Sequence, residues 1–522
     1  MNKFNSHIKI GVIALLTVFV NSCSKDNIEE PDGEPAVVSK ITISTNTNVL
    51  TEPSLNGSFK LTLTKIVNKT TTVNYTISGT ATNGEDYKMI DTKIDIPANN
   101  LSILIPIEIK DDGETEENET IIITLTNTNN PDVEIGDSNS AMITISANTE
   151  TFVLQPNETL NYMVNQNATS ETIALFYNLK ILSQTKYLIG QHDAFSSFYM
   201  DAGGDSDIKK TTGSDPSLLG SDFMFITDDL NNELLSNWYF QQEQLITGHA
   251  KEAYNKGMVN IFAWHFREPF EGLHFYTSEM TTYQKQNAFK SILPGGSNHD
   301  YYKTKLEKIA DVAKSMIGNN GELVPFIFRP FHEFDGDWFW WGAPYSTAEE
   351  FKTLWRFTVE YLRDVLQVNN ILFAFSPDNK YNNDTEYLER YPGDAYVDVL
   401  GMDNYGDFKN KGQMGVDEAN KKLKVISDLA IQKVKIAALT ETCYFVEPGV
   451  SNPITDFYSN NLYQALTKNE VELGFMMFWS NSKDRYCTPT PGLSTTPDFI
   501  TFTNKAESVL QNEIPNMYQL PN

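Results

Sequence analysis

The hydrophobic pattern of the chain changes near residue 150. Between residues 40 and 146, apolar and polar positions alternate in short segments that Asn, Asp and Gly interrupt. A period of two buries one face of a strand and leaves the other face in water. The clearest segments are Phe59–Leu63, Val73–Ile77, Ile103–Ile109 and Ile121–Leu125. The alternation predicts an all-β antiparallel sandwich over residues 40–148.

Beyond a connector over residues 149–167, short apolar runs alternate with longer segments of helical period. The eight runs are Tyr187–Asp193, Phe223–Leu230, Asn260–Phe266, Val324–Glu333, Ile371–Asp378, Val397–Tyr405, Lys435–Thr442 and Leu473–Asn481. The clearest helical segments are Tyr302–Ile317, Thr347–Leu366, Val416–Ile431 and Ile454–Asn469. Strands that are apolar throughout are typical of a parallel sheet covered on both faces. Eight strand–helix repeats predict an α/β fold, a (β/α)8 TIM barrel over residues 168–522. An open doubly wound sheet is the alternative, but no Gly-rich phosphate loop follows the first strand.

The first 22 residues have the pattern of a targeting segment. Lys3 and Lys9 precede an apolar run, Ile10–Val20, which is too short to span a bilayer because a spanning helix needs about 20 residues. The run ends in Val20-Asn21-Ser22-Cys23, which resembles a bacterial lipobox. The resemblance implies a signal peptide over residues 1–22, a lipid on Cys23, and an outer-membrane lipoprotein of the cell envelope. Residues 23–39 then form a polar, acidic tether. Ordinary secretion is the alternative.

Charge narrows the range of partners. Lys plus Arg total 40 and Asp plus Glu total 68, which gives 40 − 68 = −28. An excess of negative charge repels a phosphate backbone, so we expect no nucleic-acid partner. No sequence feature indicates an oligomer, and we expect a monomer. Besides Cys23 the chain has only Cys443 and Cys487. An exported protein can form disulfides, so these two either pair or remain separate buried thiols.

Two acidic segments of the predicted sandwich resemble the Calx-β family. They are residues 78–87, Ser-Gly-Thr-Ala-Thr-Asn-Gly-Glu-Asp-Tyr, and residues 111–119, Asp-Asp-Gly-Glu-Thr-Glu-Glu-Asn-Glu. Some Calx-β domains bind Ca²⁺ through loop carboxylates, and the ion needs six to eight oxygen ligands. The resemblance therefore makes Glu52, Asp86, Asp111 and Asp112 candidate Ca²⁺ ligands. The alternative is a solvated acidic edge that deters strand pairing between molecules. The expected role of the domain is a spacer that holds the rest of the chain away from the membrane.

Polar and aromatic residues stand at the ends of nearly all the predicted barrel strands. Active sites of such barrels lie at the C-terminal strand ends. Glu333 closes the fourth strand and Glu441 the seventh, which places them on opposite walls of the barrel mouth. Hydrolysis of a glycosidic bond needs two carboxyls, one protonated and one ionised. The two glutamates are therefore the candidate catalytic pair, and a pair of rim salt bridges is the alternative.

Several blocks of the barrel sequence resemble glycoside hydrolase family 26. They are residues 329–342, Arg-Pro-Phe-His-Glu-Phe-Asp-Gly-Asp-Trp-Phe-Trp-Trp-Gly, with residues 264–266, 293–296, 376–378, 391–394, 401–405 and 478–481. Members of that family are retaining (β/α)8 enzymes, mostly endo-β-1,4-mannanases. The resemblance implies that Glu333 is the general acid/base and Glu441 the nucleophile, with no cofactor or metal required for catalysis.

The same resemblance, together with the residue chemistry, suggests which neighbours bind the sugar. The candidates are His265, His332, Trp338, Tyr405, Trp479, Asp378, Asp403 and Trp264. Arg329 would orient the carboxylates from behind them. The expected substrate is β-mannan. Family 26 also contains β-1,3-1,4-glucanases and β-1,3-xylanases, and residues 267–272, Arg-Glu-Pro-Phe-Glu-Gly, depart from the loop that mannanases often carry. A non-catalytic, glycan-binding surface lipoprotein is the rival from another class.

Overall fold

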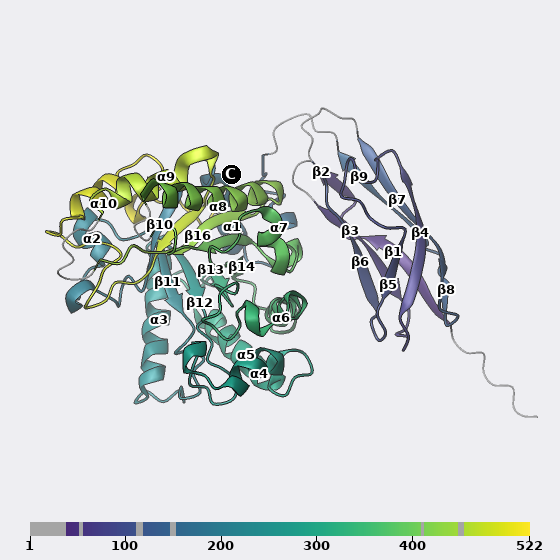
Figure 1. Ribbon diagram of the computed structural model, residues 1–522, viewed down its shortest axis with the longest axis horizontal. Helices are drawn as coiled ribbons and strands as arrows, with labels where there is room; N and C mark the ends of the chain where they lie inside the picture. The colour runs from purple at the N-terminus through teal and green to yellow at the C-terminus, as the bar shows by residue number, and fades with distance from the viewer. Residues whose placement is uncertain are drawn as a thin grey trace, which may run out of the picture.

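The computed structural model describes residues 38–51, 56–110, 118–146, 153–408, 412–446 and 454–521 (Figure 1). The N-terminal unit is a two-sheet sandwich. Its strands are β1 (Ser39–Thr45), β2 (Val49–Thr51), β3 (Gly57–Leu63), β4 (Thr71–Gly79), β5 (Lys93–Ile96), β6 (Ser102–Ile107), β7 (Glu119–Thr128), β8 (Val133–Ile135) and β9 (Ser140–Ser146). One sheet has the order β6-β3-β1-β8 and the other β2-β9-β7-β4-β5.

The sandwich prediction is confirmed. Alternate residues of the strands are buried between the sheets, among them Phe59, Leu61, Ile121 and Ile123. Most neighbouring strands are antiparallel, but β1 pairs with β8 and β2 pairs with β9 in parallel. The sequence pattern did not indicate these two parallel pairings, because strands of only three residues carry too little alternation to reveal their partner.

The C-terminal unit is a closed barrel of eight parallel strands, as predicted. They are β10 (Tyr187–His192), β11 (Leu218–Asp222), β12 (Val259–Ala263), β13 (Phe326–Arg329), β14 (Ile371–Phe375), β15 (Val399–Asp403), β16 (Ile436–Thr442) and β17 (Phe475–Phe478). The barrel closes because β10 pairs with both β11 and β17. A short strand, β18 (Ser508–Val509), also pairs with β10.

Helices surround the barrel. They are α1 (Ser170–Leu182), α2 (Asp207–Thr212), α3 (Trp238–Asn255), α4 (Thr282–Ile292), α5 (His299–Ser315), α6 (Ala348–Glu360), α7 (Asp384–Tyr387), α8 (Gly412–Gln432), α9 (Tyr463–Thr467) and α10 (Thr496–Thr503). The helix predicted over residues 454–469 is a π-helical segment, Phe457–Leu462, followed by the short α9. Among the described residues, no helix is both long and apolar enough to cross a membrane.

The second predicted strand, Phe223–Leu230, is wrong. The strand is β11, and the chain turns after it. Gly220 and Ser221 interrupt the apolar run of this strand and hid it from the pattern. The glycine is required in the barrel, since a Cβ there would lie 2.6 Å from the Met477 sulfur and 2.8 Å from His192 Nδ1. Phe223 is apolar because it is buried in the layer between strands and helices.

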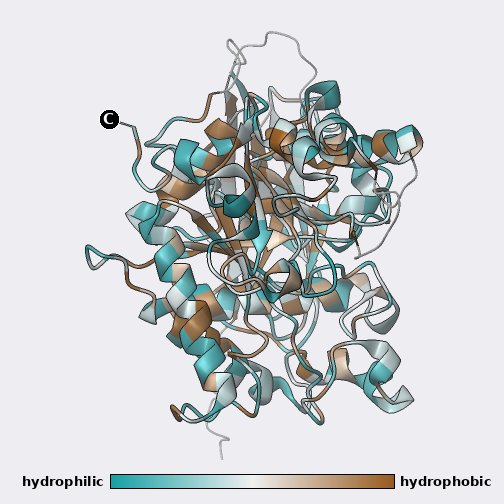
Figure 2. Ribbon diagram, turned by 90° about the vertical axis from the view of Figure 1, so that its left-hand side faces the viewer, coloured by the Kyte–Doolittle hydropathy of each residue, from teal (hydrophilic) through white to brown (hydrophobic). Residues whose placement is uncertain are grey.

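Alternate strand residues point to the barrel lumen and to the helices. Leu188, Leu218, Ile261, Ile327 and Phe475 belong to one buried cluster, whereas most of their strand neighbours, such as Ile189, Phe262, Phe328 and Met476, pack in a larger cluster with helix residues. Figure 2 shows hydrophobic positions, in brown, along the strands at the centre of the molecule. Toward the C-terminal strand ends the lumen residues become polar, and this upper layer is where the site lies.

Candidate active site

A buried arginine stands at the centre of the polar layer. Arg329 ends β13 and has no exposed surface. Its Nη1 donates to Asp403, and its Nη2 donates to Glu441 Oε2 at 2.5 Å. Burial disfavours the charge, but the two carboxylates outweigh it and raise the pKa of Arg329 above its ordinary value. A fixed cation therefore lies behind the mouth of the barrel.

Asp403 braces this arginine and does not reach the mouth. Its Oδ1 accepts hydrogen bonds from Ser376 Oγ at 2.8 Å and Thr440 Oγ1 at 2.7 Å. A Cβ at Gly401 would lie 2.6 Å from the Thr440 methyl carbon, so glycine leaves room for that donor. Since Asp403 is fully buried, the expectation that it contacts the sugar is wrong. Its place at the end of a strand is lumenal, one layer below the cleft.

Glu441 points into the lumen because the strand is irregular there. Met402 pairs with Leu439 but Asp403 pairs with Glu441, so the register shifts by one residue. Such a bulge re-aims a side chain that alternation would send outward. Glu441 Oε1 then accepts a hydrogen bond from Tyr405 Oη at 2.5 Å, and Oε2 accepts the Arg329 bond. Two donors hold the carboxylate in one orientation.

Glu333 follows β13 on a strained turn. Phe331 and Glu333 have φ values of 51° and 52°, in the region that only glycine adopts freely. The Glu333 N–H donates to the Ser376 carbonyl at 2.9 Å, which ties the turn to the next strand. Burial first, and then the charge of Glu441, raise the pKa of Glu333 well above its usual range. The turn therefore presents a carboxyl that retains its proton.

Trp338 is the hydrogen-bond partner of this acid. Its Nε1 donates to Glu333 Oε2 at 2.5 Å and lowers the pKa of Glu333 against the larger effect of burial. The indole lies directly on Gly336, where a Cβ would be 2.6 Å from the ring. Lys380 Nζ lies 4.8 Å from the ring centroid. Trp338 remains partly exposed at the mouth.

Three histidines line the same mouth. His265 and His332 have ring centroids 4.6 Å apart, and His192 stacks on Trp479 at 4.2 Å. Burial and the nearby Arg329 charge lower the pKa of His332 well below its usual value, so His332 is neutral. Trp479 is partly exposed. The arrangement places a buried carboxyl of raised pKa and a second carboxyl held by two donors beside aromatic rings, a set of groups suited to cleavage of a glycosidic bond.

The comparisons with known proteins agree with this geometry. The sequence profile of glycosyl hydrolase family 26 matches residues 164–461, more than half of the chain. The chain belongs to family 26. The Calx-beta domain profile matches residues 38–149, which cover the sandwich.

Relatives of the family 26 barrel include enzymes named as mannanases. The mannan endo-1,4-beta-mannosidase of Bifidobacterium adolescentis is 35% identical over 323 residues, 60% of this chain and 31% of that protein. The chain spans about a third of the length of the first two curated relatives. The solved structure of GH26C from a Muricauda species is 62% identical, with a TM-score of 0.71, over 71% of this chain and 100% of that chain. An endo-beta-1,4-mannanase of Cellulomonas fimi is 31% identical, with a TM-score of 0.63, over 68% of this chain and 79% of that chain.

Two further residues that were predicted to bind sugar, Trp264 and Asp378, lie in different parts of the family 26 barrel. Trp264 is 1% exposed, and its Nε1 donates to Thr227 Oγ1 at 2.8 Å in the layer between strands and helices. The prediction that it binds sugar is therefore wrong, because strand alternation turns it away from the mouth. Asp378 is partly exposed beside Glu333, and burial together with the Asp335 charge raises the pKa of Asp378 to about 7.

Besides His192, sequence reasoning missed two residues of the mouth. Asp222 ends β11 and bonds His265, but the wrong placement of this strand concealed it. Tyr276 lies in the loop after β12, is 42% exposed, and stacks on Phe339 at 5.3 Å. Its neighbourhood includes both glutamates, whose charges, after burial, raise the pKa of Tyr276. No pattern in the loop distinguishes this tyrosine from an ordinary surface residue.

Cys443 and Cys487 form a disulfide with a Cα–Cα distance of 5.2 Å, which decides between the two alternatives. The bond joins the segment just after Glu441 to the loop beyond Trp479.

Of the candidate Ca²⁺ ligands, Asp86 accepts a hydrogen bond from the Thr82 N–H at 2.5 Å. Glu52, Asp111, Asp112 and the lipidation candidate Cys23 lie outside the described residues. Within the described part of the chain, no group of three His, Cys, Asp or Glu residues could hold a metal.

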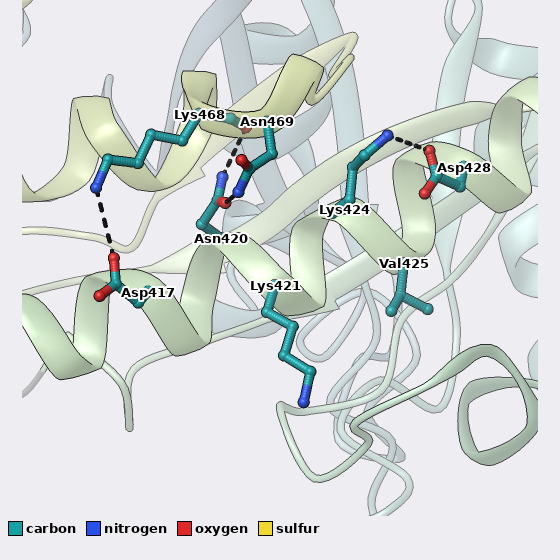
Figure 3. A pocket seen from close by; sticks show the side chains of 8 residues that line it. All are labelled: Asp417, Asn420, Lys421, Lys424, Val425, Asp428, Lys468 and Asn469. Carbon is teal, nitrogen blue, oxygen red and sulfur yellow. Dashed lines mark hydrogen bonds and ion pairs between the residues drawn. The ribbon is translucent and has the colours of Figure 1, made fainter.

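A groove on the outside of the barrel is separate from this site. It runs along α8, which covers the outer face of β15 and β16 (Figure 3). Lys468 pairs with Asp417 at 3.4 Å, and Lys424 pairs with Asp428 at 2.6 Å. Neither catalytic candidate lines the groove. Paired surface charges line this groove, and the mouth of the barrel remains the candidate site.

Proposed function

We propose that this protein is a retaining endo-β-1,4-mannanase. The observation that carries the proposal is the contrast between the two buried glutamates. Glu333 lies in surroundings that raise its pKa, whereas Glu441 has an arginine and a tyrosine donating to its two oxygens. One carboxyl has surroundings that favour its protonated form and the other is held in one orientation by two donors, which suits the division of roles that hydrolysis with retention requires.

The mechanism follows from this division. Glu333 donates its proton to the glycosidic oxygen while a Glu441 oxygen attacks the anomeric carbon, which forms a covalent glycosyl-enzyme. Glu333, now ionised, removes a proton from water, and the water cleaves the intermediate. Arg329 and Tyr405 keep Glu441 in line for the attack.

Mannan is the substrate that the relatives favour. Several of them are named mannan endo-1,4-beta-mannosidase, among them proteins of Bifidobacterium adolescentis and Bacillus subtilis. Partly exposed rings of Trp338, Trp479 and Tyr276 could stack on the apolar faces of pyranose rings. A β-glucan is the second candidate, because Endoglucanase H of Acetivibrio thermocellus is 33% identical over 161 residues.

A substrate screen tests the proposal. The soluble chain from residue 24 is incubated with galactomannan, glucomannan, lichenan and β-1,3-xylan, and reducing sugar is measured. We expect rapid release of mixed oligosaccharides from the two mannans. Release from lichenan or xylan alone would mean that a β-glucan or a xylan, and not mannan, is the substrate. No release from any polymer would favour a glycan-binding lipoprotein.

Two variants and one spectrum test the roles of the glutamates. Proton NMR of the first product should show the β-anomer before mutarotation. Glu333→Ala should still form the glycosyl-enzyme from a β-mannoside with an activated aryl leaving group, since that group needs no proton. Glu441→Ala should form none. Equal residual rates for the two variants would contradict the assignment.

The proposal extends to the N-terminus, where Cys23 would carry a lipid that holds the enzyme in the outer membrane, with the Calx-β sandwich as a spacer. Labelled palmitate should enter the full chain in a bacterial host and should be absent from Cys23→Ala. A full chain that takes up no label would support ordinary secretion.

A further inference from the structure

Asp222 is a buried carboxylate of the barrel mouth that the mechanism above does not use. It is the last residue of β11 and shares the lumenal side of that strand with Leu218 and Gly220. Its side chain is 13% exposed and that of His265 is 11% exposed. A carboxylate so deeply placed needs partners for both oxygens. Each of its oxygens has such a partner.

The partners of Asp222 are His265 and the turn that follows β11. Oδ2 lies 2.5 Å from His265 Nδ1. Oδ1 accepts the backbone N–H of His265 at 3.1 Å and that of Met224 at 2.7 Å. The contact therefore fixes both the ring and the backbone of the histidine. Burial opposes the charge of Asp222, but His265 outweighs it and the pKa of Asp222 is lowered, so Asp222 is an acceptor only.

An acceptor at Nδ1 determines the tautomer of the imidazole. The Nδ1 nitrogen must carry the hydrogen that Asp222 accepts, and Nε2 is then the nitrogen left for another partner. The His265 ring stands at the cleft, 5.9 Å from the ring of Trp479 and 4.6 Å from the ring of His332. These rings fill the space around it but donate nothing to Nδ1.

We propose that Asp222 is a positioning residue of the reaction, which holds His265 with a protonated Nδ1 turned toward Asp222, so that Nε2 faces the cleft and hydrogen-bonds a hydroxyl of the bound sugar. The inference rests on the proposed function. It assigns Asp222 no direct contact with substrate, so its whole effect should pass through His265.

A double-mutant cycle tests this dependence. The initial rates of Asp222→Asn, His265→Ala and the double variant are compared with wild type on mannohexaose. Asparagine keeps the size of the side chain and an acceptor for the backbone N–H groups. We expect kcat/KM to fall roughly 10- to 100-fold in Asp222→Asn, the range typical when the hydrogen-bond partner of a metal-binding histidine is lost. In the His265→Ala background the same substitution should change kcat/KM by less than about twofold. An equal loss in both backgrounds would overturn the proposal.

Asp215→Asn is the matched control. Asp215 precedes the same strand at its opposite end, is 5% exposed, and pairs with Lys256 at 3.2 Å. Its loss removes a buried carboxylate far from His265. Near-wild-type kcat/KM in Asp215→Asn would show that the effect of Asp222→Asn is specific.

An NMR spectrum of the histidine rings tests this inference independently of the proposed function. The chain has seven histidines, and in protein labelled with ¹⁵N-histidine the His265 signals are those missing from His265→Ala. Wild type should show a protonated Nδ1, and Asp222→Asn should lose that pattern. An unchanged pattern overturns the inference even if the enzyme is active. A wild type that cleaves no glycan refutes the proposed function, while the spectrum still tests the tautomer.

Discussion

Trp338→Phe removes one hydrogen bond from the proposed acid and retains an aromatic ring over Gly336. In the structure the indole Nε1 donates to Glu333 Oε2 at 2.5 Å. A hydrogen bond to a carboxylate stabilises the ionised form and lowers the pKa of the acid. Phenylalanine has no such donor, so the pKa of Glu333 should rise further above its ordinary value.

The size of the shift follows from the strength of the bond. A hydrogen bond to a charged group contributes about 1.5–3 kcal/mol, and one pKa unit corresponds to about 1.4 kcal/mol. The expected rise is therefore about 1–2 units. Glu333 must be protonated to assist the leaving group, so activity is lost as the pH rises through its pKa. A higher pKa moves this alkaline limb of the profile to higher pH by the same amount.

The measurement is kcat/KM on mannohexaose from pH 4 to pH 10 for wild type, Trp338→Phe and Trp479→Phe. Trp479 is another partly exposed indole of the mouth, but it stacks on His192. Its substitution should lower kcat/KM without moving the alkaline limb. An unmoved or lowered limb in Trp338→Phe would refute the role of the Nε1 hydrogen bond.

Three further predictions concern the groups around Glu441. Arg329→Met leaves buried carboxylates unpaired, and urea unfolding at pH 7 should show a loss of about 3–5 kcal/mol; a loss below about 1 kcal/mol would contradict the central place of this cation. Tyr405→Phe removes a donor worth about 1.5–3 kcal/mol, so kcat should fall roughly 10- to 150-fold while the urea midpoint stays unchanged. A drop in the midpoint with intact kcat would make the tyrosine a structural residue. Cys443→Ser with Cys487→Ser should lower the unfolding free energy by about 2–4 kcal/mol, and wild-type stability of this double variant would show that the disulfide contributes little.

Much of the candidate site could be found without coordinates. The two glutamates stand at the C-terminal ends of apolar runs, and the closure of eight such runs brings these ends together whatever the loops do. The strained turn at Glu333 and the bulge before Glu441 only refine where each carboxyl points. The position of each glutamate at the end of an apolar run therefore indicated the pair and the end of the barrel where it lies.

The roles of the neighbouring residues could not be assigned in that way. Asp403 and Trp264 stand at strand ends with polar or aromatic character, as sugar-binding residues do. One is nevertheless buried beneath the mouth, and the other lies on the helix side of its strand. Depth in the lumen depends on strand register and tilt, which are set by pairing between distant segments. Asp222 was missed for a related reason, since the glycine that weakens its strand pattern is required by Met477, far along the chain.

By itself, the sequence determined the two architectures and the catalytic candidates, because hydrophobic period and strand-end chemistry are properties of neighbouring residues. Only the tertiary structure decided which side chains face the cleft, whether the two cysteines pair, and which carboxylate holds His265. Each of these depends on contacts between segments dozens to hundreds of residues apart, and no local pattern records such a contact.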